Sequence, residues 1–363
     1  MRRILLFIDS LGAGGAQRQL VGLAVMLKQR GFITKVVTYY NHPFYKYILD
    51  ENNCDYECLN VNSKFCLPKL VRCIKLFKAD VLISYQTDPN ALACIAAAMT
   101  RTKLIVSERN THLSISFKDR IIFQLYRYAN RIVPNSYSEG QFICGKFAFL
   151  ASKVVVISNF VDLRLFTPCN NKVLGVTKKI LIVASVKASK NTKNFIYAIN
   201  LAKKRGCKIH ITWYGVNPAN SDLRENVQYA NECMELVRKL GLDNELKLLP
   251  KRQDIQNAYR EADIFCLPSF FEGTPNVICE AMASGLPVIA SRVCDNSCYI
   301  KDGYNGILFN PNDIESIADA IIRLVNMAAE DLLLWGQRSR SLVEKLCSEV
   351  TFINKYIDLI DSI

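Results

Sequence analysis

Two successive rounds of alternating strand and helix patterns constrain the fold of this chain most strongly. Short runs rich in Val, Ile and Leu alternate with longer stretches in which apolar residues recur with helical period. In the first round the predicted strands are residues 4–9, 34–39, 81–84, 104–107, 132–134 and 154–157. In the second round they are residues 180–184, 209–214, 246–249, 264–267 and 288–290. This rhythm predicts an α/β protein with two Rossmann-like, doubly wound parallel sheets.

The stretch between the two rounds predicts where one domain ends and the next begins. Residues 159–179 are polar, contain Pro and Gly, and show little periodicity, as is typical of a linker. We therefore expect an N-terminal domain over residues 1–165 and a C-terminal domain over residues 166–345. Ligands of open α/β sheets bind beyond the carboxyl ends of the strands, so two such domains facing each other predict a site in a central cleft.

Composition argues against several other classes of protein. The longest apolar run, residues 92–99, falls well short of the ~18 to 20 residues that span a bilayer. Residues 1–15 are interpreted as a first strand and a Gly-rich turn rather than a signal peptide. The 14 cysteines then indicate reduced thiols in a cytosolic protein. The pairs Cys54/Cys58 and Cys294/Cys298 have neither the spacing nor a neighbouring histidine for a structural zinc site.

A glycine loop follows the first predicted strand. Gly12, Gly14 and Gly15 precede a helix whose apolar positions keep a 3.6 period. Glycines let backbone N–H groups approach a ligand closely, and a helix N-terminus favours negative charge. We therefore predict that Gly14 and Gly15 contact a phosphate or a donor sugar, although a simple tight turn accounts for the loop equally well.

The most informative segment is residues 268–291. It predicts a strand, a loop that contains Glu272, and then a helix with Thr274 as its N-cap and Pro275 at its first position. The helix is predicted to end at Gly285, before another strand. Amides around Gly273 then form an anion cradle for a diphosphate, and of Glu272 and Glu280 one carboxylate can face a sugar while the other accepts from ribose hydroxyls. Taken alone, Glu280 is equally well a solvated glutamate of the helix.

This segment resembles the retaining glycosyltransferases of family 4, which have the GT-B fold. The family's signature of two glutamates separated by seven residues is present as Glu272 and Glu280. Residues 14–18 and 302–309 resemble two further segments of the family, so the resemblance covers nearly the whole chain. It implies that the N-terminal domain binds the acceptor and that the C-terminal domain binds the nucleotide-sugar, where Glu280 binds the nucleotide ribose and Glu272 contacts the donor sugar. It also implies that amides near Gly273, Thr274, Asn276 and Val277 hold the phosphates, and that a final helix, residues 346–363, crosses back to the first domain.

The chain departs from the family pattern in two places. Lys190 matches the family's lysine that neutralises the diphosphate, but Ser185 stands where an arginine is expected. Lys187 or Arg252 is a candidate substitute. After the predicted strand 104–107 no histidine aligns with the one that many members carry, and we therefore take Glu108 and Arg109 as candidate catalytic residues that orient the acceptor or contact the donor. A salt bridge within the loop is an equally good interpretation of this pair.

Positive charge is concentrated in the first half of the chain. Residues 1–170 contain 22 Lys and Arg against 11 Asp and Glu, so they carry +11 of the total charge of +13. Residues 64–78, 117–131 and the surroundings of Lys146 and Lys153 combine these charges with apolar side chains. Such patches suit an anionic membrane surface, while ordinary packing on the sheet explains any single one of them.

Together these features predict a retaining glycosyltransferase, located in the cytoplasm and peripherally on the inner face of the membrane. The expected partners are a nucleotide-sugar donor, preferably a UDP-sugar and alternatively a GDP-sugar, and a lipid-linked saccharide acceptor of cell-surface polysaccharide synthesis. Neither a cofactor nor a metal ion is expected, since no Asp-x-Asp triplet is present. The alternatives are a nucleotide-sugar epimerase and an inactive sugar-nucleotide-binding homologue. A nucleic-acid-binding protein is not favoured, because no recognition motif accompanies the basic half.

Overall fold

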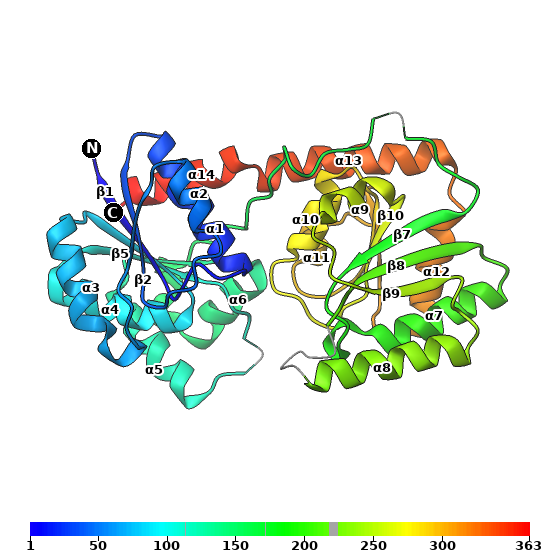
Figure 1. The fold of residues 1–363 in the computed structure, drawn as a ribbon, viewed down its shortest axis with the longest axis horizontal. Coiled ribbons are helices and arrows are strands. Elements are labelled where there is room, and N and C mark those ends of the chain that lie inside the picture. Colours follow the sequence, from blue (N-terminus) through cyan, green and yellow to red (C-terminus); the bar gives the residue numbers. More distant parts are fainter. Residues whose placement is uncertain (113, 171, 218–223) are drawn as a thin grey trace. The chain divides into compact units, whose positions relative to one another are not determined.

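The computed structural model describes residues 1–112, 114–170, 172–217 and 224–363. They form two compact units, residues 1–160 with 349–363, and residues 161–348 (Figure 1). The predicted boundaries after residues 165 and 345 lie close to these. Each unit contains a six-stranded sheet in which all pairs are parallel. The two doubly wound α/β sheets expected from the sequence are therefore confirmed.

The sheet of the first unit has the order β3-β2-β1-β4-β5-β6. Its strands are β1 (Arg3–Ile8), β2 (Ile33–Thr38), β3 (Asp55–Cys58), β4 (Val81–Tyr85), β5 (Lys103–Glu108) and β6 (Arg131–Pro134). Its helices are α1 (Gly15–Gln29), α2 (Lys46–Glu51), α3 (Ser63–Phe77), α4 (Thr87–Thr100), α5 (Phe117–Leu125), α6 (Tyr137–Lys146) and α14 (Glu349–Asp361), with the short 3₁₀ turns η1 (Tyr126–Tyr128) and η2 (Ala148–Lys153). Buried apolar clusters cover both faces of this sheet.

The sheet of the second unit has the order β12-β11-β10-β7-β8-β9. Its strands are β7 (Lys178–Val183), β8 (Ile209–Val216), β9 (Leu246–Pro250), β10 (Ile264–Leu267), β11 (Val288–Ser291) and β12 (Gly306–Phe309). Its helices are α7 (Thr192–Lys204), α8 (Arg224–Lys239), α9 (Ile255–Glu261), α10 (Asn276–Ala283), α11 (Asn296–Tyr299), α12 (Ile314–Val325) and α13 (Ala329–Cys347), with the 3₁₀ turn η3 (Ala188–Lys190). Two further apolar clusters cover its faces.

Three strand predictions need correction. The β-branched run 154–157 is not a strand, because only Val154 forms a bridge, to Ile132 at the edge of the sheet. The strands β3 and β12 were not predicted. The first is a partly exposed edge strand without an apolar run, and the second has only four residues after a turn. Of the predicted linker, residues 178 and 179 already belong to β7, and residue 171 lies outside the described residues.

The last helix, α14, is part of the first unit. Its side chains Phe352, Ile353, Tyr356, Leu359 and Ile360 are buried in the cluster that also contains β1 and α1. The Tyr356 hydroxyl lies 2.8 Å from the Tyr85 hydroxyl at the end of β4. The first unit is therefore completed by residues from both ends of the sequence. Among the described residues, no helix is both long and apolar enough to cross a bilayer.

Candidate functional site

In the second unit, the loops that follow β7 and β10 bring Lys190 and Glu272 together. Lys190 Nζ lies 2.5 Å from Glu272 Oε1, and the hydroxyl of Ser269 donates to the same oxygen at 2.5 Å. The two loops are also joined by their backbones, because Phe270 N donates to Ser189 O at 3.0 Å. The Glu272 residue is only 9% exposed. Residues 82 positions apart thus form an ion pair at the carboxyl edge of the sheet, in which the carboxylate is buried and the lysine is partly buried.

Helix α10 follows this ion pair directly. It begins at Asn276, and Pro275 is its N-cap, so the predicted N-cap at Thr274 is wrong. Proline fixes φ but leaves ψ free, and at Pro275 ψ is 74°, outside the helical range. Gly273 and Thr274 precede the helix, and Val277 lies in its first turn. As predicted, Gly285 lies just beyond the helix end, with a φ of 72° that favours glycine.

Glu280 lies on the second turn of α10 and is 6% exposed. The hydroxyl of Tyr259, on α9, donates to Glu280 Oε2 at 3.1 Å. A buried carboxylate requires hydrogen-bond donors, and a carboxylate can accept from the protein and from the hydroxyls of a ligand. Its position on the helix that carries the predicted anion cradle is consistent with a contact to ribose hydroxyls.

Arg252 lies beside a pocket of about 220 Å³ that is also lined by Ser185, Tyr214 and Gly215. Its guanidinium binds the carboxylates of Asp254, at 2.8 and 3.0 Å, and Glu261, at 3.0 Å. These hydrogen bonds raise the pKa of Arg252 and lower that of Asp254. Two nearby carboxylates therefore balance the charge of Arg252. Lys187, by contrast, forms no ion pair with the described part of the chain.

The predicted glycine loop lies in the first unit. Gly14 is the N-cap of α1 and Gly15 its first residue. A Cβ atom on Gly14 would lie 2.2 Å from Oε1 of Gln17, so the Gln17 amide occupies space that is open because Gly14 has no side chain. The Gln17 amide in turn donates to Asp9 Oδ1, at the end of β1, at 3.1 Å. The loop therefore positions Asp9 and Gln17.

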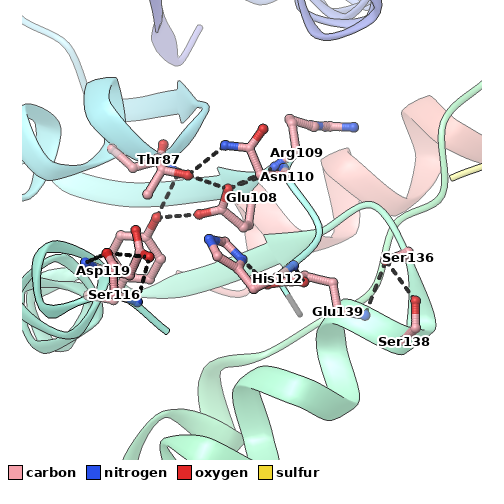
Figure 2. Close-up of polar contacts among 12 residues, drawn as sticks. Thr87, Glu108, Arg109, Asn110, His112, Ser116, Asp119, Ser136, Ser138 and Glu139 are labelled. Carbon is pink, nitrogen blue, oxygen red and sulfur yellow. Dashed lines mark hydrogen bonds and ion pairs between the residues drawn. The ribbon is translucent and has the colours of Figure 1, made fainter. Parts of the chain in front are cut away.

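Glu108 is the last residue of β5, and Arg109 begins the turn that follows (Figure 2). Glu108 is fully buried and accepts hydrogen bonds from the hydroxyls of Thr87 and Tyr126, both at 2.7 Å. Burial raises the pKa of Glu108, and these hydrogen bonds partly offset the rise. The Arg109 guanidinium lies 3.9 Å from the Tyr85 ring centroid and donates to Tyr356 at 3.0 Å. Both side chains therefore anchor the turn in this geometry, and their catalytic role stays a prediction.

His112 and Glu139 form a pair that the sequence interpretation missed. Glu139 Oε1 lies 2.7 Å from His112 Nδ1, and its Oε2 accepts the backbone N–H of His112 at 2.9 Å (Figure 2). Glu139 is fully buried on α6, where Ser136 Oγ accepts its N–H at 3.1 Å. The helix-capping spacing of Ser136 and Glu139 is readable in the sequence. The pairing with a histidine 27 residues away is not.

A pocket of about 410 Å³ lies in the first unit beside this pair. It is lined by Asp9, Tyr39, Tyr40, Ser63, Gln86, Thr87, Asp88, Pro89, Asn110, His112, Lys118 and Asp119. These residues follow β1, β2, β3, β4 and β5, so the pocket is at the carboxyl edge of the sheet. The strand order reverses between β1 and β4, which is where open α/β sheets bind ligands.

Comparisons with known proteins agree with this geometry. Residues 13–165 match the sequence family described as Glycosyltransferase Family 4, and residues 177–327 match the one described as Glycosyl transferases group 1. The chain belongs to glycosyltransferase family 4. The solved glycosyltransferase from Rickettsia africae has a TM-score of 0.85 and 19% identity, covering 99% of this chain and 98% of its own. The HepE protein of Anabaena, in complex with UDP and glucose, has a TM-score of 0.84 and 19% identity over the full length of both chains. The fold of this glycosyltransferase is GT-B.

Two curated relatives are more informative about chemistry. An Escherichia coli protein, the UDP-Gal:α-D-GlcNAc-diphosphoundecaprenol α-1,3-galactosyltransferase, is 26% identical over 74% of this chain and 73% of its own length. A Campylobacter jejuni protein is 25% identical over 90% of this chain and 89% of its own. It is an α-1,4-N-acetyl-D-galactosaminyltransferase acting on a GalNAc-containing glycan of diphosphoundecaprenol. Both relatives act on saccharides linked to undecaprenol through a diphosphate.

The His112–Glu139 pair makes the stability of this glycosyltransferase depend on pH. The hydrogen bond from Glu139 raises the pKa of His112, against the effect of burial. The pair therefore stabilises the fold fully below about pH 6.5, the ordinary histidine pKa, and this contribution is lost as the pH rises through the raised value. We expect His112→Gln to lower the Tm by about 2–4 °C at pH 6 and by less at pH 9. Thermal unfolding of both proteins at the two pH values measures this. An equal difference at both values would contradict the charge pairing.

Proposed function

We propose that this glycosyltransferase transfers a sugar from a UDP-sugar to a saccharide carried by a polyprenyl diphosphate. The contact between Lys190 and Glu272, directly before α10, carries the proposal. It places one cation and one carboxylate at the helix end whose amides favour the diphosphate. Glu280 then contacts the ribose, and Glu272 contacts the sugar that is transferred.

We also propose that transfer proceeds with retention of configuration and without a metal ion. Lys190 and the first-turn amides of α10 supply the positive charge that stabilises the leaving diphosphate. Glu272 is held by Lys190 and Ser269, both at one of its oxygens. This arrangement suits a carboxylate that contacts sugar hydroxyls, and supports front-face substitution rather than a covalent intermediate.

The acceptor belongs to the membrane surface in this proposal. Both relatives described above act on undecaprenyl-linked saccharides. In the first unit, Phe65 and Leu76 on α3, and Phe117 and Ile121 on α5, are exposed. Basic residues accompany them on these elements, namely Lys64, Lys69, Arg72, Lys75, Lys118 and Arg120. Such surfaces bind anionic lipids peripherally, and they support the proposal of an enzyme on the inner face of the membrane, in the synthesis of cell-surface polysaccharide.

A transfer assay tests the proposal. The acceptor is GlcNAc-diphosphoundecaprenol in vesicles with or without anionic phosphatidylglycerol, and the donors are UDP-Gal, UDP-GalNAc, UDP-Glc, UDP-GlcNAc and GDP-mannose. We expect product from one UDP-sugar, with an α-linkage by NMR, undiminished by EDTA and faster on anionic vesicles. UDP binding without any transfer would indicate an inactive homologue, and conversion of the donor sugar without acceptor would indicate an epimerase.

The Glu280→Ala variant tests the nucleotide contact separately. A ligand at 100 times its Kd adds about 2.7 kcal/mol of stability, so UDP should raise the Tm of the wild type measurably. Loss of a charged hydrogen bond costs about 1.5–3 kcal/mol, and we therefore expect UDP to bind about 10- to 100-fold more weakly to Glu280→Ala. Glu235→Ala on α8, an exposed glutamate, is the matched control. Equal UDP shifts in both variants would show that Glu280 does not contact the nucleotide.

A further inference from the structure

A single residue makes the whole connection between β4 and α4. The strand ends at Tyr85 and the helix begins at Thr87, so Gln86 alone turns the chain. Its N–H donates to Ser107 O on β5 at 3.1 Å, and its carbonyl accepts from Asn90 N in the helix at 2.9 Å. Both backbone groups of Gln86 are therefore fixed, one by the sheet and one by the helix.

The backbone of Gln86 is strained. Its φ is 77° and its ψ is 151°, a region that essentially only glycine adopts. Glycine would make the same turn without this strain, yet a long amide side chain is present. Backbone strain of this kind clusters at active sites and ligand-binding sites.

The Gln86 amide is held in a small polar network. In the orientation that satisfies both of its ends, its nitrogen donates to Asp9 at 3.1 and 3.2 Å, and its oxygen accepts from Gln17 Nε2 at 3.2 Å. Gln17 also donates to Asp9 Oδ1 at 3.1 Å, which closes the triad. The absence of a side chain at Gly14 gives Gln17 its place. Three elements of the first unit thus fix one amide at the edge of the pocket described above.

The pocket has the chemistry of a site for a neutral, hydroxyl-rich ligand. Its acids are Asp9, Asp88 and Asp119, whereas its ammonium group, Lys118, already binds Asp88 at 2.6 Å. Such a lining repels a diphosphate and accepts hydrogen bonds from hydroxyl groups. The rings of Tyr39 and Tyr40, with centroids 4.6 Å apart, add an apolar wall. Glu139 holds Nδ1 of His112, which leaves its Nε2 for the ligand.

We infer that Gln86 is a specificity-determining residue, which together with Asp9 orients the terminal sugar of the acceptor in this pocket. The inference rests on the proposed function for the identity of the acceptor. The one-residue turn presents the Gln86 side chain at the point where the strand order of the sheet reverses. A glycine at position 86 would remove the backbone strain but would also remove the side-chain amide, and this accounts for a strained glutamine at this position.

Glycine substitution at the two ends of α4 tests this directly. Gln86→Gly removes the amide and relieves the backbone strain. Arg101→Gly is the control, because it relieves the strain of a left-handed backbone, φ 59°, at the other end of the same helix and outside the pocket. We expect Arg101→Gly to raise the Tm with unchanged kinetics. We expect Gln86→Gly to keep a Tm no lower than that of the wild type, while the KM for GlcNAc-diphosphoundecaprenol rises 10- to 100-fold and the donor KM changes less than twofold.

Asp9→Asn, which keeps the size of the side chain and removes its charge, is the second variant, and we expect the same rise in acceptor KM. An acceptor KM within twofold of the wild type in both variants would overturn the inference, since Gln86 and Asp9 would then only hold the turn.

If UDP stabilises the wild type but no sugar is transferred, the chain is an inactive homologue or uses another acceptor. Saturation-transfer NMR then tests the pocket without transfer. The probes are the methyl glycosides of GlcNAc, GalNAc, galactose and glucose. A signal that is lost in Gln86→Gly and kept in Arg101→Gly supports the sugar site. No signal in the wild type, or equal signals in both variants, overturns it.

Discussion

Glu272→Gln should lower kcat about 100- to 1000-fold while UDP still raises the Tm. The substitution keeps the size of the side chain but removes the charge that faces Lys190 at 2.5 Å and accepts from Ser269. A preorganised charge in a water-poor site stabilises the charge that develops in the transition state, and loss of one such group costs about 10²–10³ in kcat. The measurement is steady-state transfer at saturating donor and acceptor.

Glu235→Gln is the matched control for this substitution, because Glu235 lies exposed on α8. Its kcat should equal that of the wild type. A Glu272→Gln enzyme with a kcat within threefold of the wild type would remove Glu272 from the reaction and leave the Lys190–Glu272 pair as a structural contact.

Lys190→Ala should lower transfer about 100-fold or more, and far more than Lys187→Ala. Lys190 is the predicted cation for the leaving diphosphate, and its removal also leaves Glu272 buried without its ion-pair partner. Breaking a buried pair destabilises the fold by about 3–5 kcal/mol, so the Tm of Lys190→Ala should fall as well. Lys187 forms no ion pair within the described residues, which makes it the appropriate control on the same loop.

The double variant Lys190→Ala/Glu272→Ala separates the two effects. Its Tm should recover toward that of the wild type, because no unpaired charge remains buried. Its transfer activity should stay as low as that of the less active of the two single variants. A larger loss of transfer in Lys187→Ala than in Lys190→Ala would instead mean that the resemblance of this loop to the family has been aligned wrongly.

The parts of this structure that depend on local pattern could be predicted from the sequence. The parallel strands follow from short β-branched runs between helical periods, and the contact of Lys190 with Glu272 is consistent with the family motif. The prediction of a strand at residues 154–157 was wrong because strand propensity says nothing about whether a partner strand is available. The prediction of Thr274 as N-cap was wrong by one residue, because sequence patterns do not define the start of a helix more closely than that.

The parts that depend on contacts between distant residues could not be predicted. Glu139 pairs with His112 through the arrangement of α6 beside the turn after β5, and no spacing encodes this. The positive φ of Gln86 follows from the direct junction of strand and helix, which is visible only once both bounds are known. Arg252 could be named as a cation, but its two carboxylate partners decide how much of its charge reaches a ligand.

The position of α14 has a consequence for how the protein is made. Residues 349–361 fill the apolar cluster of the first unit, next to strands and helices formed by the opening residues of the sequence. During synthesis on the ribosome, the opening residues therefore emerge long before the segment that completes their core. The second unit, whose residues 161–348 are contiguous, is finished first. Until residues 349–361 emerge, the nascent first unit therefore keeps part of its apolar surface uncovered, and such transient exposure makes a folding chain prone to aggregation.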